Sequence, residues 1–163
     1  MHFDHLRKSI RVLGIVTFVG AAAASQGASA EDASTTFKDI EATLGMVPSF
    51  FKAFPESGVA GAWAEFKTIQ LNPKTALSGK EKELIGLAVA AQIPCSYCIY
   101  FHTAAAKANG ATDQEIREAV AMAAITRHWS TVLNGMDVDL PRFKAETDKT
   151  LALAGEKAKN GNQ

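Results

Sequence analysis

The sequence predicts an all-α fold, and three features support that prediction. From residue 34 onward the apolar residues recur at helical spacing, without the sustained alternation that marks a strand. The segments Ser78–Glu81 and Thr112–Glu115 have the form of helix capping boxes. Three segments between residues 88 and 124 are rich in alanine, whose small side chain lets helices approach closely. The 163 residues suit one domain.

The first thirty residues form a predicted secretory signal. A basic region ends at Arg11, an apolar stretch of thirteen residues follows, and Ala28-Ser29-Ala30 supplies a small-residue cleavage site. An uncleaved membrane anchor is the alternative, but an apolar stretch must reach roughly 20 residues to span a bilayer. We therefore expect a protein that is cleaved after Ala30, is not stably inserted in a membrane, and is periplasmic or secreted. That location permits disulfides.

Helix start and stop signals divide the N-terminal half of the mature chain. A first helix is predicted over residues 35–44, and it stops at Gly45. A second helix ends near Asn72-Pro73. The capping box at Ser78 then opens a helix that runs to about Gln92.

Proline and glycine mark the helices of the C-terminal half. Pro94 interrupts the helical pattern, because a proline inside a helix costs about 3 kcal/mol. The next helix is predicted over residues 95–109 and is closed by Gly110. The second capping box opens a long helix toward Leu133, and a polar last helix follows Pro141.

The predicted folded domain covers residues 31–155, and residues 156–163 form a polar tail expected to fray. Three of the 17 basic residues and one of the 17 acidic residues precede residue 31, so 14 and 16 remain in the mature chain. This slightly acidic balance does not attract phosphate backbones, and we expect no nucleic-acid partner. A small molecule or a protein is the expected partner.

Two cysteines, Cys95 and Cys98, stand at a predicted helix N-terminus, where unpaired N–H groups and the helix dipole stabilise a thiolate. At about 100° per residue, these cysteines and His102 lie within an arc of about 60°. His102 is four residues after Cys98, close enough to exchange a proton with its sulfur, and the two cysteines are spaced to close a small disulfide. Glu83, in the preceding helix, would orient His102 and raise its basicity.

One pattern joins these residues: Glu83-x11-Cys95-x2-Cys98-x3-His102, followed by Gly110-Ala111-Thr112 and an alanine-rich helix. The pattern resembles the alkylhydroperoxidase D (AhpD) branch of the carboxymuconolactone decarboxylase-like superfamily. The resemblance covers about residues 77–134, and residues 44–54 look like the N-terminal part of that superfamily.

The resemblance implies an all-α protein that assembles into trimers or hexamers and reduces peroxides without a bound cofactor. It makes Cys98 the peroxide-reacting thiolate, Cys95 the resolving partner, and Glu83 and His102 a proton relay. An external thiol or protein reductant is needed to reset the disulfide, and the sequence does not identify this electron donor. One departure is Tyr97, which stands where the AhpD motif has a second histidine and so removes one proton-transferring group.

Four other interpretations of the motif remain open. The protein could exchange disulfides with a protein partner, or it could be a non-catalytic oligomeric module in which the cysteines form a structural disulfide. Closing so short a loop adds little stability, which argues against the structural role. The third interpretation is a lactone decarboxylase, and the cysteine pair argues against it because that reaction does not need paired thiols. The same four side chains suit zinc, although structural zinc usually takes ligands from separated segments.

Several other side chains are predicted to pack rather than react. His128 is expected at a helix contact or an interface. Phe50, Phe51 and Phe54 form an aromatic cluster that could line a substrate pocket or a subunit contact. Four residues at helical spacing are expected in the core: Trp63, Phe66, Met122 and Trp129.

Overall fold

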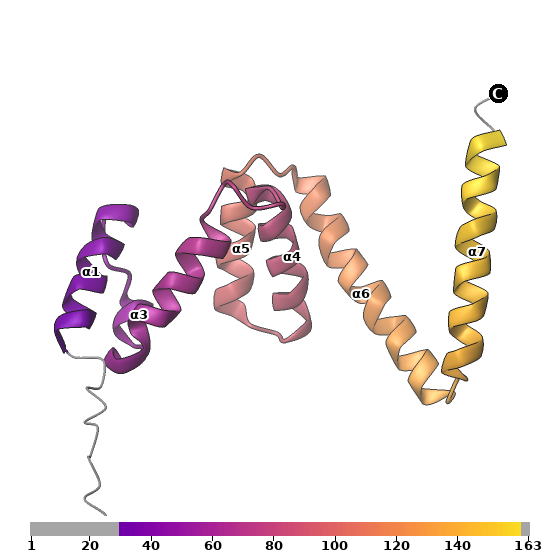
Figure 1. The fold of residues 1–163 in the computed structure, drawn as a ribbon, viewed down its shortest axis with the longest axis horizontal. Helices are drawn as coiled ribbons and strands as arrows, with labels where there is room; N and C mark the ends of the chain where they lie inside the picture. The colour runs from indigo at the N-terminus through magenta and orange to yellow at the C-terminus, as the bar shows by residue number, and fades with distance from the viewer. Residues whose placement is uncertain (1–29, 161–163) are drawn as a thin grey trace, which may run out of the picture. The chain divides into compact units, whose positions relative to one another are not determined.

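A computed structural model of the chain describes residues 30–160, and every regular element in that range is helical (Figure 1). The predicted all-α fold is therefore confirmed. The predicted signal segment lies outside the described residues, apart from Ala30, with which helix α1 begins. Among the helices within the described range, none combines the length and hydropathy needed to cross a membrane.

The chain divides into two compact units, Met1–Ala60 and Gly61–Gln163. In the described part of the first unit, α1 (Ala30–Leu44) is followed by the single turn α2 (Ser49–Lys52), and α3 (Glu56–Glu65) continues through the division. The second unit holds the remaining elements, and each unit has buried side chains of its own.

Helix α1 buries one stripe of side chains in the first unit. Ala33, Thr36 and Ile40 are spaced three and four residues apart, so they share one helix face, and all three are buried. The helix stops as predicted at Gly45, whose φ of +80° suits a residue without a Cβ. It starts five residues before the predicted Thr35, because burial of Ala33 outweighs the weak helix propensity of the Ser/Thr run.

The predicted phenylalanine cluster around α2 is only partly buried. Phe51 is buried, whereas Phe50 and Phe54 are exposed, and the rings of Phe50 and Phe51 lie 4.4 Å apart between centroids. Phe54 lies against Gly58, where a Cβ would meet its ring at 2.8 Å. Only one of the three rings therefore contributes to the buried core of this unit.

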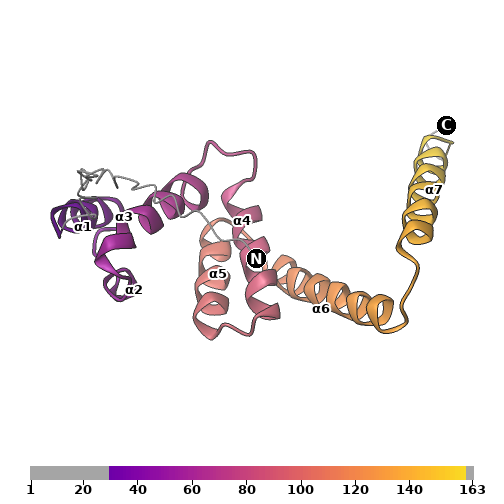
Figure 2. The same ribbon diagram turned by 60° about the horizontal axis from the view of Figure 1, so that its bottom comes forward.

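Three helices form the packed centre of the second unit, as predicted from their alanine content. Helices α4 (Gly79–Gln92), α5 (Ser96–Ala108) and α6 (Asp113–Gly135) pack on one another (Figures 1 and 2). Each contributes one fully or nearly fully buried alanine at this centre: Ala90, Ala106 and Ala123. These small side chains permit the close approach of the helices.

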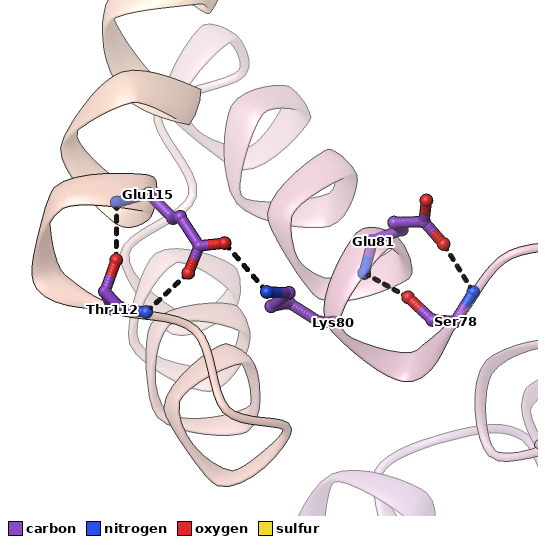
Figure 3. Close-up of polar contacts among 5 residues, drawn as sticks. All are labelled: Ser78, Lys80, Glu81, Thr112 and Glu115. Atoms are coloured by element: carbon purple, nitrogen blue, oxygen red, sulfur yellow. Dashed lines mark hydrogen bonds and ion pairs between the residues drawn. The ribbon is translucent and has the colours of Figure 1, made fainter.

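Both predicted capping boxes are present, and a lysine joins them (Figure 3). The backbone N–H of Glu81 donates to Ser78 Oγ, and the N–H of Ser78 donates to the Glu81 carboxylate at 2.6 Å. Thr112 and Glu115 repeat the arrangement at the start of α6. Lys80 Nζ donates to Glu115 Oε1 at 2.7 Å, so the first turns of α4 and α6 are tied together.

Two residues expected in the core are exposed instead. Trp63 is buried at 4% exposure, but Met122 and Trp129 of α6 are 57% and 55% exposed. Helical periodicity identifies residues that share a face, and it does not reveal whether another element of the same chain covers that face.

The last helix differs from the prediction at both ends. Helix α7 (Leu140–Asn160) begins one residue before Pro141, with Asp139 accepting the N–H of Arg142 at its start. Proline is tolerated in a first turn because its missing N–H would have no helical partner there. The helix continues through residues 156–160 of the predicted tail, and none of its residues is buried.

Candidate functional site

The two cysteines begin helix α5 and are joined to each other. Cys95 is the N-cap residue of the helix, and Cys98 stands on its first turn. They form a disulfide with their Cα atoms 5.3 Å apart. The backbone N–H of Cys98 also donates to Cys95 Sγ at 3.2 Å. The sulfur of Cys95 therefore accepts one of the N–H groups that a helix start leaves without a helical partner.

Glu83 and His102 meet between α4 and α5. His102 Nδ1 lies 2.7 Å from Glu83 Oε2, and the glutamate is buried at 4% exposure, although it carries an ionisable group. An ionised carboxylate only accepts hydrogen bonds, so opposite an ionised Glu83 the ring nitrogen Nδ1 carries the hydrogen and is the donor. In a neutral ring the lone pair then lies on Nε2. His102 and Cys98 are four residues apart on α5, so they are neighbours on one face of that helix.

A third side chain reaches Glu83 from outside the predicted pattern. The π-helix η1 (Phe66–Gln70) ends at Gln70, whose amide Nε2 lies 3.1 Å from Glu83 Oε1 and 3.5 Å from Oε2. Gln70, Glu83 and His102 thus form one continuous hydrogen-bonded chain from three elements. Sequence reasoning missed Gln70, because a glutamine at a helix end carries no chemical signature of its own.

His102 lies directly against the backbone of α4 at Gly86. A Cβ built on Gly86 would overlap the imidazole ring, with Cε1 as the nearest atom. Sequence reasoning also missed this contact. A signal was present, because a glycine in a helix interior costs about 1 kcal/mol relative to alanine and usually has a packing reason.

Aromatic residues surround the site. The Phe101 ring meets the His102 ring edge-on at 5.3 Å between centroids, and Phe66 of η1 lies 6.2 Å from Phe101. Tyr97, between the two cysteines, is 89% exposed, and Tyr100 one turn later is 79% exposed. The disulfide is thus flanked by aromatic side chains that water or a partner can reach.

Two further predictions concern metals and His128. Within residues 30–160, no three His, Cys, Asp or Glu side chains are grouped as ligands for one metal ion. His128 lies on α6 with its ring edge-on to Trp129, at 5.4 Å between centroids. Both of those side chains are exposed. His128 is therefore part of an open surface of α6.

The comparison with protein-family models decides the family. The model of the carboxymuconolactone decarboxylase family matches residues 58–139, which is half of the chain. The chain belongs to this family. The matched range contains the whole of helices α4, α5 and α6, together with all four predicted site residues. The resemblance stated from the motif is confirmed.

A solved structure supports the AhpD branch in particular. The chain is similar to the alkylhydroperoxidase AhpD core from Rhodospirillum rubrum, with 29% sequence identity and a TM-score of 0.59. The match covers 66% of this chain and 82% of that one. No protein with a curated function matches the chain significantly. The fold of this carboxymuconolactone decarboxylase family member is thus AhpD-like.

Proposed function

We propose that this family member is a thiol-dependent peroxidase that cycles between a Cys95/Cys98 dithiol and the disulfide. One observation carries the proposal: the disulfide begins a helix whose next turn bears His102, and His102 is bonded to the buried Glu83. The similarity to an alkylhydroperoxidase core supports the same reaction class.

Glu83 and His102 act as the proton relay in this proposal. With Nδ1 bonded to the carboxylate, Nε2 takes the proton from the Cys98 thiol one turn earlier, and Glu83 stabilises the imidazolium that forms. Burial of Glu83 strengthens this interaction, because the local dielectric is lower than that of water. The relay then returns the proton to the oxygen that leaves the peroxide.

The electrons and atoms balance over two steps. The Cys98 thiolate attacks the peroxide, so that an S–O bond forms, the O–O bond breaks, and the departing alkoxide takes the proton held by His102. This leaves an alcohol, or water from hydrogen peroxide, and a sulfenic acid on Cys98. The Cys95 sulfur then attacks Cys98, displaces water and forms the disulfide seen in the structure.

Reduction of the disulfide completes the cycle and needs two electrons from outside. An external thiol attacks Cys98 Sγ to form a mixed disulfide, and Cys95 leaves as a thiolate that the N–H of Cys98 stabilises. A second donor thiol then attacks the donor sulfur of the mixed disulfide, which releases the Cys98 thiolate and leaves the donor as a disulfide. In this proposal the helix N-terminus stabilises the thiolate of Cys95, whereas His102 accepts the proton of Cys98. The donor is a thiol or protein reductant of the compartment to which the predicted signal exports the chain.

Disulfide exchange with a protein partner is the second candidate, and the exposure of Tyr97 and Tyr100 beside the disulfide favours it. Aromatic side chains are enriched in protein–protein interfaces relative to the rest of the surface. A purely structural disulfide would make no use of the Glu83–His102 pair, and a lactone decarboxylation would make no use of the disulfide.

Trapping of the sulfenic acid tests the proposed reaction. Cys95→Ser has no resolving thiol, so one equivalent of peroxide should leave a sulfenic acid on Cys98 that a dimedone-type probe labels. Cys98→Ser should give no labelled product at the same peroxide concentration. Peptide mass spectrometry reads both results. Labelling of Cys95 in Cys98→Ser but not of Cys98 in Cys95→Ser would reverse the assigned roles, and labelling of neither would contradict the peroxidase.

A further inference from the structure

We propose that Gln70 is a positioning residue of this site: its amide fixes the Glu83 carboxylate on His102 Nδ1 and so fixes the imidazole tautomer. The inference rests on the proposed peroxidase and names a residue that the motif does not contain. The side-chain amide of Gln70 bonds to Glu83, and Gln70 acts through that residue.

The contacts of Glu83 carry the first step. A buried carboxylate must be hydrogen-bonded, because burial removes the water molecules that would otherwise bond to it. Gln70 Nε2 lies 3.1 Å from Glu83 Oε1 and 3.5 Å from Oε2, and His102 Nδ1 lies 2.7 Å from Oε2. The amide nitrogen, and not the amide oxygen, faces Glu83, because an ionised carboxylate only accepts. Gln70 thus limits rotation of the carboxylate.

The backbone around Gln70 is anchored to both helices of the site. Leu71 N–H donates to Phe66 O at 3.1 Å, the wider bond of a π-helical turn, which places Gln70 at the end of η1. Lys82 Nζ of α4 donates to Asn72 O at 2.7 Å, directly after that turn. Phe66 at the start of η1 lies beside Phe101 of α5. Gln70 is therefore held at a fixed distance from Glu83.

The position of the Glu83 carboxylate decides which nitrogen of the neutral His102 ring carries the hydrogen. An isolated neutral imidazole carries its proton on either nitrogen, and the hydrogen bond at one nitrogen decides the choice. With Glu83 held on Nδ1, the lone pair stays on Nε2, where it can accept a thiol proton. If the carboxylate turns away, His102 loses this bias and the fraction of rings competent to accept the proton falls.

Two variants of the full chain separate positioning from packing. Gln70→Met keeps the length of the side chain and removes the donor. Gln70 also lines an open hollow of about 240 Å³ with Ala62 and Ile69, so this replacement need not disturb a tightly packed core. Gln70→Glu keeps the shape and sets a second carboxylate against Glu83. Gln114→Met is the matched control, since Gln114 also donates to a glutamate, at 2.9 Å from Glu118, but on the exposed surface of α6.

Two readouts are needed for each variant. The nitrogen-15 chemical shifts of His102 at pH 8 report its tautomer, with the signal assigned by its loss in His102→Ala and with His128 as an internal reference. Stopped-flow loss of thiol with hydrogen peroxide reports the rate. In Gln70→Met we expect His102 to move from the Nδ1–H form toward a mixture and the rate to fall about 10-fold, the order expected for one hydrogen bond to a charged group. Gln70→Glu should change the tautomer and the rate at least as much, and Gln114→Met should change neither quantity.

An unchanged His102 tautomer in Gln70→Met and Gln70→Glu would overturn the inference, whatever happens to the rate. A slower rate with an unchanged tautomer would show a structural role only. The tautomer is measured without peroxide, so a parent protein that fails to react with peroxide would contradict the proposed function and leave the Gln70 result readable. The two failures are therefore distinguishable.

Discussion

At the scale of single residues, the site depends on how closely His102 approaches the backbone of α4. The ring fills the space that a side chain at position 86 would occupy, and from there Nδ1 reaches Glu83. The motif predicted that Cys98 and His102 share a face, because both stand on one helix. It could not show that Gly86 and Gln70 come to the same place, because those contacts join three separate elements.

Gly86→Ala is expected to slow thiol oxidation without unfolding the protein. The new methyl group displaces the imidazole, and a misplacement of about 1 Å in a reacting group costs on the order of 100-fold in rate. Alanine also favours the helix by about 1 kcal/mol relative to glycine, so lost helix stability does not explain a slower reaction. Stopped-flow kinetics and thermal unfolding measure the two effects.

Gly155→Ala is the matched control for that variant. Gly155 lies within helix α7, and a Cβ built on it meets no atom within 4 Å. The same substitution should there leave the oxidation rate unchanged. An unchanged rate in Gly86→Ala as well would show that the position of His102 is not critical.

At the scale of elements, helix starts are the features that sequence predicted best. Both capping boxes are formed by residues three apart in the chain, and Cys95 caps its own helix, so local chemistry decides each of them. The Lys80–Glu115 contact spans two helices and was not predicted. The hydrogen bond from Lys80 is the largest cause, and those with Thr112 come next, in lowering the pKa of Glu115 from 4.5 to about 2.

That lowered pKa predicts a loss of stability in acid. A carboxylate with a lower pKa in the folded state stabilises the fold above its unfolded pKa, and the contribution disappears as the pH falls through the folded value. The contribution of Glu115 should therefore be complete above pH 4.5 and be lost toward about pH 2. Glu115→Gln should unfold at a lower temperature than the parent at pH 7, and the difference should shrink across that window.

Thermal unfolding monitored by circular dichroism from pH 7 down to about 2 measures this difference. Glu156→Gln, on the exposed end of α7, is the control and should match the parent throughout. A Glu115→Gln deficit that stays constant as the pH falls would show that the carboxylate charge is not its cause.

At the scale of the whole molecule, the helices of the second unit expose apolar faces. Met122, Ile125 and Trp129 form a stripe along α6, at spacings of three and four residues, and each is about half exposed. Ile85 and Val89 on α4 are also exposed. The all-α class was predictable because periodicity and caps are local. Which faces stay open was not, since covering a face depends on distant segments or on another chain.

These faces predict self-association. Soluble monomers rarely expose contiguous apolar patches larger than a few hundred Å², so we expect copies of this chain to cover them, in keeping with the trimers or hexamers implied by the AhpD resemblance. Light scattering should give a multiple of the chain mass, which is 17.3 kDa with the signal. Trp129→Glu should shift the protein toward smaller species. A monomer at concentrations of tens of micromolar would contradict this prediction.

The central claim is that Cys98, assisted by His102, reduces peroxide and is resolved by Cys95. Its most direct test is stopped-flow oxidation of the reduced protein by hydrogen peroxide and by an organic hydroperoxide, beside Cys98→Ser and His102→Ala. In the parent we expect fast loss of two thiols to a Cys95–Cys98 disulfide. Cys98→Ser should show no fast phase, and His102→Ala should react about 100-fold more slowly, as for loss of a general base. Oxidation of the parent no faster than that of free cysteine would contradict the central claim.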